Sequence, residues 1–456
     1  MTERVKIKMN NNISEDDFFR TESIRKIILK LAPPIMLAQL IQALYNIVDS
    51  YFVGKFSDDA LTALSVIYPI QFVIIALGVG TGIGVNTYMA SLYALKKKDE
   101  ADKTAGTGIM LAAAMWLVFS VLCIFFLKFY ISVSAKSEAA VSYANTYGLI
   151  VCIGSLGIFL ESIFTKIHQS IGNMKTPMLA QIFGAAMNIV LDPILIFGPG
   201  PFPAMGISGA AVATVIGQFT AAAVTGFTAY IKFPKLKESV EYIKPIFGYG
   251  YPQILMQMLM TLYIVVLNII LAGFNDAAVT SLGLYYKLQT FFFIPLCALQ
   301  TCIVPVLSFN YTVKDYKRCH RLIMETLFIS SALMLVGVFA FEIIPDKLIM
   351  LFTHDKQTIE IGSRAFRIIA LSFIPIVFSL VFPVFFQAIG KSVQSVFLAV
   401  MRQIICLIPI FWLLSKISLD VTWFAFPIAE IVTGGCGGIM YIITYRRWKK
   451  EMKSNS

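Results

Sequence analysis

The sequence has few charged residues. Only 14% of its 456 residues are Asp, Glu, Lys or Arg, whereas a typical soluble domain has about 25%. Because 58% of the residues are hydrophobic, so few charges could not cover the surface of a soluble protein of this size. The composition therefore excludes a soluble globular protein, a disordered chain and a fibrous chain. It indicates a membrane protein that crosses the bilayer many times.

Histidine is also scarce, and the cysteines are not paired. The three histidines lack metal-ligand spacing, and none of the seven cysteines belongs to a CxxC motif. This pattern predicts neither a disulfide framework nor a zinc site. We therefore expect no resident metal and no cofactor, apart from an ion that the protein transports.

Twelve apolar windows of the length of a membrane span follow one another along the chain. A helix of about 20 residues crosses the hydrocarbon core of a bilayer. We therefore predict an all-α polytopic membrane protein with twelve transmembrane helices. The windows are 27–53, 60–94, 105–131, 141–165, 177–198, 206–231, 246–272, 277–309, 322–345, 359–388, 393–415 and 420–445.

The basic residues lie mostly on one side of these windows. The terminal segments and the loops after even-numbered windows hold 26 Lys and Arg residues, and the other loops hold 6. Positive residues collect in cytoplasmic segments, so we predict a multi-pass protein of the cell membrane with both termini in the cytoplasm. This distribution explains the net charge of +11 without a nucleic-acid partner.

The two halves of the chain resemble each other when Pro34 is aligned with Pro252 and no gap is allowed. We call this alignment the repeat offset. Between 34–71 and 252–289, thirteen of 38 positions are identical, where composition alone would give roughly three. The repeat offset also aligns 169–172 with 387–390, and Gly217 with Gly435. Each half has six windows, so both halves have the same orientation. They should therefore form two lobes related by a pseudo-twofold axis along the membrane normal.

This duplication predicts the domain organisation. We expect a cytoplasmic amino-terminal segment, an amino-terminal lobe, a cytoplasmic linker, a carboxy-terminal lobe and a cytoplasmic tail. Their residues are 1–26, 27–231, 232–245, 246–445 and 446–456. Transporters built from such repeats bind substrate between the halves and rock them to alternate access.

Several ordered motifs resemble those of the MATE (multidrug and toxic compound extrusion) transporters. The resemblance runs through roughly 25–445 and implies a twelve-helix, two-lobe antiporter. Such a protein expels cationic or amphipathic drugs in exchange for H⁺ or Na⁺. The motifs lie at 34–54, 169–173, 188–193, 206–214 and 308–311.

The resemblance also implies a cation site in the amino-terminal lobe. Asp49, Asn188 and Asp192 occupy positions that match the acid and the Asn/Asp pair of many members, and Thr214 matches a further position. H⁺ or Na⁺ would be the coupling ion. Some members instead use acids of the second half. Here Leu267 is aligned with Asp49 at the repeat offset. The sequence therefore departs from the pattern of the members that use acids of the second half.

The residues themselves support the same cluster. An ionised carboxylate in hydrocarbon needs a partner, water or a proton. Asn188 and Asp192 are four residues apart and therefore share one face of a helix. An amide oxygen beside carboxylates suits Na⁺ or a shared proton, and Pro193 could free a backbone carbonyl as another ligand. Two alternatives are that Asp49 lies in water at the interface, and that Asp192-Pro193 ends a helix at the outer surface.

Other polar residues within the windows have two possible roles. Glu430 and Arg402 lie on adjacent predicted helices, so they form a buried salt bridge, or Glu430 contacts a substrate cation. Lys287 is predicted to be buried, where it would repel cations or neutralise an acid. We interpret Glu161 and Lys166 as structural residues.

Bulky organic cations favour aromatic and thioether contacts. The better candidates for substrate binding are polar or amphipathic residues in the paired windows of the two halves. They are Gln42, Tyr45, Tyr68, Gln71, Gln257, Tyr263, Tyr286 and Gln289, to which Lys287 and Glu430 are added.

Taken together, these features predict a secondary active multidrug efflux antiporter that works as a monomer among membrane lipids and is not an enzyme. One alternative is a lipid-linked saccharide flippase of similar two-lobe architecture, which would need a cationic cavity for a pyrophosphate. A second alternative is a channel or a membrane receptor, which the duplicated halves disfavour.

Overall fold

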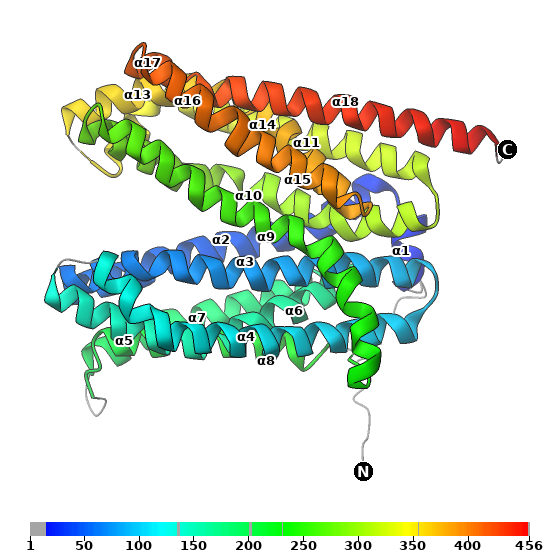
Figure 1. Ribbon diagram of the computed structural model, residues 1–456, viewed down its shortest axis with the longest axis horizontal. Coiled ribbons are helices and arrows are strands. Elements are labelled where there is room, and N and C mark those ends of the chain that lie inside the picture. The colour runs from blue at the N-terminus through cyan, green and yellow to red at the C-terminus, as the bar shows by residue number, and fades with distance from the viewer. Residues whose placement is uncertain (1–14, 135–136, 200–202, 230, 354, 455–456) are drawn as a thin grey trace.

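The chain folds into two helical lobes, which lie one above the other in Figure 1. The computed structural model describes residues 15–134, 137–199, 203–229, 231–353 and 355–454. Residues 1–14 of the predicted amino-terminal segment lie outside the described residues. All regular structure in the described ranges is helical. The predicted fold class, an all-α membrane protein of two lobes, is confirmed.

The amino-terminal lobe contains five long helices and one bent pair. The bend, between α5 and α6, is 41° and lies at Gly154 and Ser155, a residue pair that often kinks helices. The helices are α2 (Ile24–Phe56), α3 (Asp58–Ala94), α4 (Lys98–Ser134), α5 (Glu138–Gly154), α6 (Leu156–Ser170), α7 (Lys175–Phe197) and α8 (Ile207–Gly226).

The carboxy-terminal lobe repeats this order with more interruptions. Here the bend between α13 and α14 is 57°, and Pro375 begins the second helix of the pair. The helices are α9 (Leu236–Ala272), α10 (Asp276–Thr312), α11 (Tyr316–Ile343), α12 (Pro345–Met350), α13 (Lys356–Ala370), α14 (Pro375–Ala388), α15 (Ser392–Val400), a π-helix (Met401–Leu407), α16 (Ile408–Ser415), α17 (Leu419–Thr422) and α18 (Ala425–Ser454).

The number of spans agrees with the sequence. Ten helical segments of the described chain are long and apolar enough to cross a membrane, and the two bent pairs make twelve. α9 begins at Leu236, inside the predicted linker 232–245, and α18 continues to Ser454, inside the predicted tail. Some long helices extend beyond the apolar windows into charged residues, as α4 does at Lys98 and Asp99.

The backbone also repeats at the repeat offset. Lys96 and Lys314 are the two non-glycine residues of the described chain with positive φ, at 59° and 60°. Gly172 and Gly390 both have a φ of 77°. The members of each pair occupy equivalent positions of the two halves, so equivalent turns of the two lobes have the same conformation. The internal repeat seen in the sequence is therefore a structural repeat.

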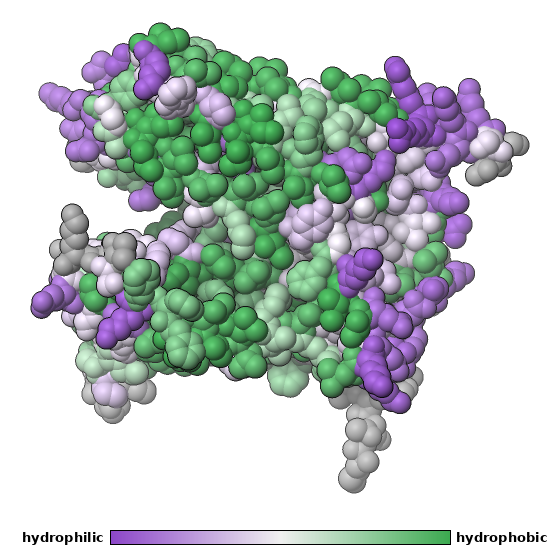
Figure 2. Space-filling model, viewed as in Figure 1, coloured by the Kyte–Doolittle hydropathy of each residue, from purple (hydrophilic) through white to green (hydrophobic). Residues whose placement is uncertain are grey.

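Lysine-bearing turns gather at one end of the molecule. The turns that carry Lys96, Lys97 and Lys314 lie at the right of Figure 1, where the described chain also ends. We call this the basic end. Figure 2 shows hydrophobic side chains between the two polar ends, as a membrane-spanning surface requires,. It also shows a hollow between the lobes at the end opposite to the basic end.

The lobes pack closely toward the basic end. A Cβ atom at Gly84 of α3 would overlap the Ile246 carbonyl oxygen of α9, and a Cβ at Gly250 would lie 2.6 Å from the Gly80 oxygen. The side-chain oxygens of Ser91 and Ser308 are 2.7 Å apart. Small residues let helix backbones approach this closely, so these glycines hold the two lobes together.

This contact gives a prediction about stability. Gly84→Ala should lower the free energy of unfolding by about 1–3 kcal/mol, because a methyl group there forces two backbones apart. Gly283→Ala is the matched control, since nothing lies within 4 Å of a Cβ at that position. Helix propensity alone would make the control neutral or stabilising by up to about 1 kcal/mol. Thermal unfolding in detergent should separate the two variants, and equal midpoints would contradict the prediction.

The short helix α1 (Glu15–Thr21) connects the lobes at the same end. Phe19 is buried, and its ring centroid lies 5.8 Å from that of Phe309 on α10. The Phe19 carbonyl accepts hydrogen bonds from Asn310 Nδ2 at 3.2 Å and from Arg318 Nε at 3.0 Å. On the other side, a Cβ at Gly172 of the amino-terminal lobe would lie 3.2 Å from the Phe19 ring. This segment therefore contacts both lobes.

Candidate functional site

The four residues predicted to bind the coupling ion come from three helices of the amino-terminal lobe. Asp49 lies on α2, Asn188 and Asp192 lie on α7, and Thr214 lies on α8. All four are buried, and Asp192 is 0% exposed. Asn188 Nδ2 donates a hydrogen bond to Asp192 Oδ1 at 3.3 Å. The carboxyl groups of Asp49 and Asp192 are close enough to interact electrostatically.

The cluster has more acceptor atoms than partners. Asp49 Oδ1, Asn188 Oδ1, Asp192 Oδ2 and Thr214 Oγ1 are buried and have no hydrogen-bond partner. Buried polar atoms are normally satisfied, and two adjacent carboxylates repel each other unless a proton or a cation lies between them. The residues therefore fit a bound H⁺ or a hard cation, which oxygen ligands suit.

The structure argues against the two alternatives to this cluster. Asp49 is only 8% exposed, so it is not immersed in water at the interface. α7 continues through Pro193 to Phe197, so Asp192-Pro193 does not end the helix. The helix ends instead at Gly198, which has the left-handed φ of 62° that a glycine C-cap allows,.

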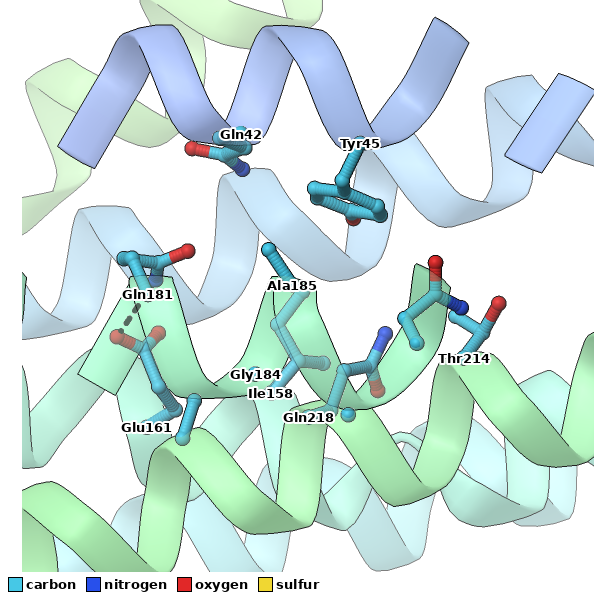
Figure 3. A pocket seen from close by; sticks show the side chains of 12 residues that line it. Gln42, Tyr45, Ile158, Glu161, Gln181, Gly184, Ala185, Thr214 and Gln218 are labelled. Atoms are coloured by element: carbon cyan, nitrogen blue, oxygen red, sulfur yellow. Dashed lines mark hydrogen bonds between the residues drawn. The ribbon is translucent and has the colours of Figure 1, made fainter. Parts of the chain in front are cut away.

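A cavity opens beside the cluster, between α2, α6, α7 and α8. Its volume is about 70 Å³, which is room for a few water molecules and less than the volume of a drug-sized site. Figure 3 shows Gln42 and Tyr45 of α2 pointing across it toward α7 and α8. The residues that line it are Gln42, Tyr45, Ile158, Glu161, Gln181, Gly184, Ala185, Asn188, Thr214, Gly217, Gln218 and Ala221.

Three polar residues of this cavity were not predicted from the sequence. Glu161 was interpreted as structural, but it lines the cavity, where its Oε1 accepts hydrogen bonds from Gln181 Nε2 at 3.0 Å and Thr165 Oγ1 at 2.7 Å. Gln181 precedes Asn188 by seven residues, and Gln218 follows Thr214 by four. Both spacings place the side chains on one helix face, so this signal was available in the sequence.

The predicted substrate residues of α3 lie outside the cavity lining. Gln71 Nε2 donates to the Tyr147 hydroxyl at 3.4 Å, and Tyr147 is buried on α5. Tyr68 is 60% exposed, one turn away from Gln71. The structure thus brings Gln42 and Tyr45 to the cavity, together with Asn188 and Thr214 of the ion cluster.

In the carboxy-terminal lobe, two of the predicted residues are in ring contact. Tyr263 of α9 and Tyr286 of α10 have ring centroids 6.2 Å apart. Gln257 and Gln289 are half-buried on the same two helices. None of these four residues lines the cavity of the amino-terminal lobe.

The predicted burial of Lys287 is wrong. The buried face of α10 passes through Leu284, Tyr285 and Leu288, and Lys287 lies beside this face and is exposed. Its Nζ lies 5.9 Å from the centroid of the Phe352 ring. The apolar window did not reveal which face of the helix packs against the lobe.

Glu430 forms the buried salt bridge that was the first of its two predicted roles. Arg402 Nη2 lies 2.8 Å from Glu430 Oε1, and Arg402 Nε lies 3.0 Å from Oε2. Ser379 also donates a hydrogen bond to Oε2. The side chains of Arg402 and Glu430 are 14% and 3% exposed. Both carboxylate oxygens are therefore occupied by groups of the protein.

Comparison with known proteins decides the family. The MatE family model matches residues 34–194 and 252–413, which is more than half of the chain and includes both copies of the repeat. The protein belongs to the MatE family. Its two lobes are therefore the two halves of a MATE transporter.

Relatives of this MATE protein are similar over nearly their whole length. The multidrug export protein MepA of Staphylococcus haemolyticus is 25% identical over 441 residues, 94% of this chain and 95% of that protein. An FAD transporter of Shewanella oneidensis is 22% identical over 90% of this chain and 93% of that protein.

Solved structures show the same fold. An outward-facing multidrug resistance MATE family transporter has a TM-score of 0.89 at 21% identity, over 96% of this chain and all of that chain. A MOP superfamily transporter from Pyrococcus furiosus has a TM-score of 0.88 at 21% identity, over 96% and 99% of the two chains.

Proposed function

We propose that this MATE protein is an antiporter that exports cationic or amphipathic organic compounds in exchange for H⁺ or Na⁺. The observation that carries the proposal is the set of four unpartnered oxygens on Asp49, Asn188, Asp192 and Thr214. They come from α2, α7 and α8, so an ion bound among them draws three helices together. We also propose that the basic end is cytoplasmic and that the protein works as a monomer in the cell membrane.

The cavity next to this cluster explains how ion and drug would exclude each other. Asn188 and Thr214 belong both to the cluster and to the cavity wall. An ion that engages their oxygens pulls α7 and α8 toward Asp49 on α2 and changes the shape of the space beside Tyr45. Ion entry from outside would then favour drug release, and ion release inside would let drug bind.

The charge of the cavity supports a cationic or neutral substrate. Its charged lining residue is Glu161, and the two acids of the ion cluster lie beside it. A saccharide flippase would instead need basic residues for a pyrophosphate. The FAD carried by the Shewanella relative is likewise an anion, which such a wall would repel.

Ethidium efflux from proteoliposomes tests this function. The pH gradient and the Na⁺ gradient should be imposed separately, with protein-free vesicles as the control. One inward charge gives about 2.3 kcal/mol per 100 mV, which corresponds to roughly fiftyfold accumulation. We expect one of the two gradients to drive efflux and its collapse to stop it. Retention of ethidium under both gradients would refute the proposal for this substrate class.

A further inference from the structure

The Arg402–Glu430 pair lies where the amino-terminal lobe has its cavity. At the repeat offset, α7 (Lys175–Phe197) corresponds to 393–415, and Gly184 corresponds to Arg402. Ser379, which hydrogen-bonds Glu430, corresponds to Glu161, and Tyr263 corresponds to Tyr45. Gly184, Glu161 and Tyr45 all line the amino-terminal cavity. Arg402, Ser379 and Tyr263 therefore stand at positions equivalent to three residues of the cavity wall.

The arginine bridges two helices of the second lobe. Arg402 lies on the π-helix, and its guanidinium group binds Glu430 on α18. In the first lobe the equivalent position is Gly184, where a Cβ atom would lie 2.8 Å from the Gly217 carbonyl oxygen, so α7 and α8 are in backbone contact.

The ion ligands of the first lobe have no counterparts in the second. The repeat offset places Leu267, Cys406, Ile410 and Val432 where the first lobe has Asp49, Asn188, Asp192 and Thr214. None of these four side chains carries an oxygen atom. The acid of this region is Glu430, which stands where the first lobe has Val212.

We propose that the Arg402 guanidinium is a tethered cation that permanently fills the carboxy-terminal counterpart of the ion cavity, so that coupling ions bind only in the amino-terminal lobe. This inference rests on the proposed antiport function. Arginine keeps its charge in proteins and binds a carboxylate with two parallel N–H groups. Glu430 is therefore neutralised throughout the cycle, whereas Asp49 and Asp192 have unpartnered oxygens that a mobile ion must satisfy.

Guanidinium binding to an Arg402→Gly variant tests the tethered cation. Removal of the side chain should leave a hole with a carboxylate at its end, which free guanidinium can fill. We expect low millimolar guanidinium chloride, against NaCl of equal ionic strength, to raise the unfolding midpoint of the variant. At ten times the dissociation constant, the ratio of folded to unfolded protein should increase about elevenfold. The wild type and Arg402→Gly/Glu430→Gln should show no such shift.

A second measurement remains useful if Arg402→Gly does not fold. Arg402→Met/Glu430→Gln has no charge in the pair and should transport with the same ion-to-substrate ratio as the wild type. A changed ratio in that variant would overturn the proposal. The proposal would also be overturned if guanidinium did not change the unfolding midpoint of Arg402→Gly. An equal rise of the midpoint in Arg402→Gly/Glu430→Gln would overturn it as well. The midpoint shift involves no transport, so a failure of the antiport function would be seen separately, as a lack of ion-driven efflux by the wild type.

Discussion

Asp49→Asn should weaken binding of the coupling ion by about 10- to 100-fold. The substitution keeps the shape of the side chain and removes its charge, and an interaction with a charged group contributes about 1.5–3 kcal/mol. Asp49 is the acid of the cluster that lies on α2, so the substitution also removes the charged contact between α2 and the ion. The measurement is the concentration of H⁺ or Na⁺ that gives half-maximal ethidium efflux. Asp276→Asn, at an exposed acid of α10, is the matched control.

The second acid of the cluster makes this prediction more specific. Asp192→Asn should cause a defect of similar size, because both carboxylates face the same ion. Because both residues bind the same ion, their effects should not simply add. Asp49→Asn/Asp192→Asn should therefore be more impaired than either single variant, but by less than the product of the two single effects. Unchanged half-maximal concentrations in both single variants would exclude this cluster as the coupling site.

The architecture was predictable because it follows from the hydrophobicity of the bilayer, which acts on long segments of the chain. A bilayer demands long apolar helices and repels charge, so composition and apolar windows indicate the membrane spans. The duplication was visible because residues such as Gly172 and Gly390 keep a turn that requires the same positive φ. The helix bends were not predictable, because a hydropathy window does not distinguish a straight span from one broken at Ser155.

The candidate site was predicted in part for a similar reason. Asn188 and Asp192 share a face of one helix, so their spacing alone brings them together. The same reasoning, extended by two turns to Gln181, would have found more of the cavity. Lys287 shows the limit, because a single lysine in an apolar window does not reveal which side of its helix is buried. The contact of Ser379 with the Arg402–Glu430 pair required the structure.

Arg402→Met should destabilise the protein more than Gly84→Ala does. It leaves the Glu430 carboxylate, 3% exposed, without its counter-charge. Breaking a buried ion pair by removal of one partner typically costs about 3–5 kcal/mol. Lys287→Met, which removes an exposed cation from the same lobe, should change the free energy of unfolding by less than about 0.5 kcal/mol. Chemical or thermal unfolding in detergent measures both variants.

The compensating variant shows whether charge or packing causes that loss. Replacement of both partners of a buried pair by neutral groups of similar volume is often neutral or stabilising. Arg402→Met/Glu430→Gln should therefore regain most of the stability that Arg402→Met loses. If the double variant is as unstable as the single one, the stabilising contribution of Arg402 is packing of its aliphatic stem. If it recovers, the charge of Glu430 is what the guanidinium must balance. An acid that needs permanent neutralisation in this lobe cannot also serve as a site that binds and releases an ion.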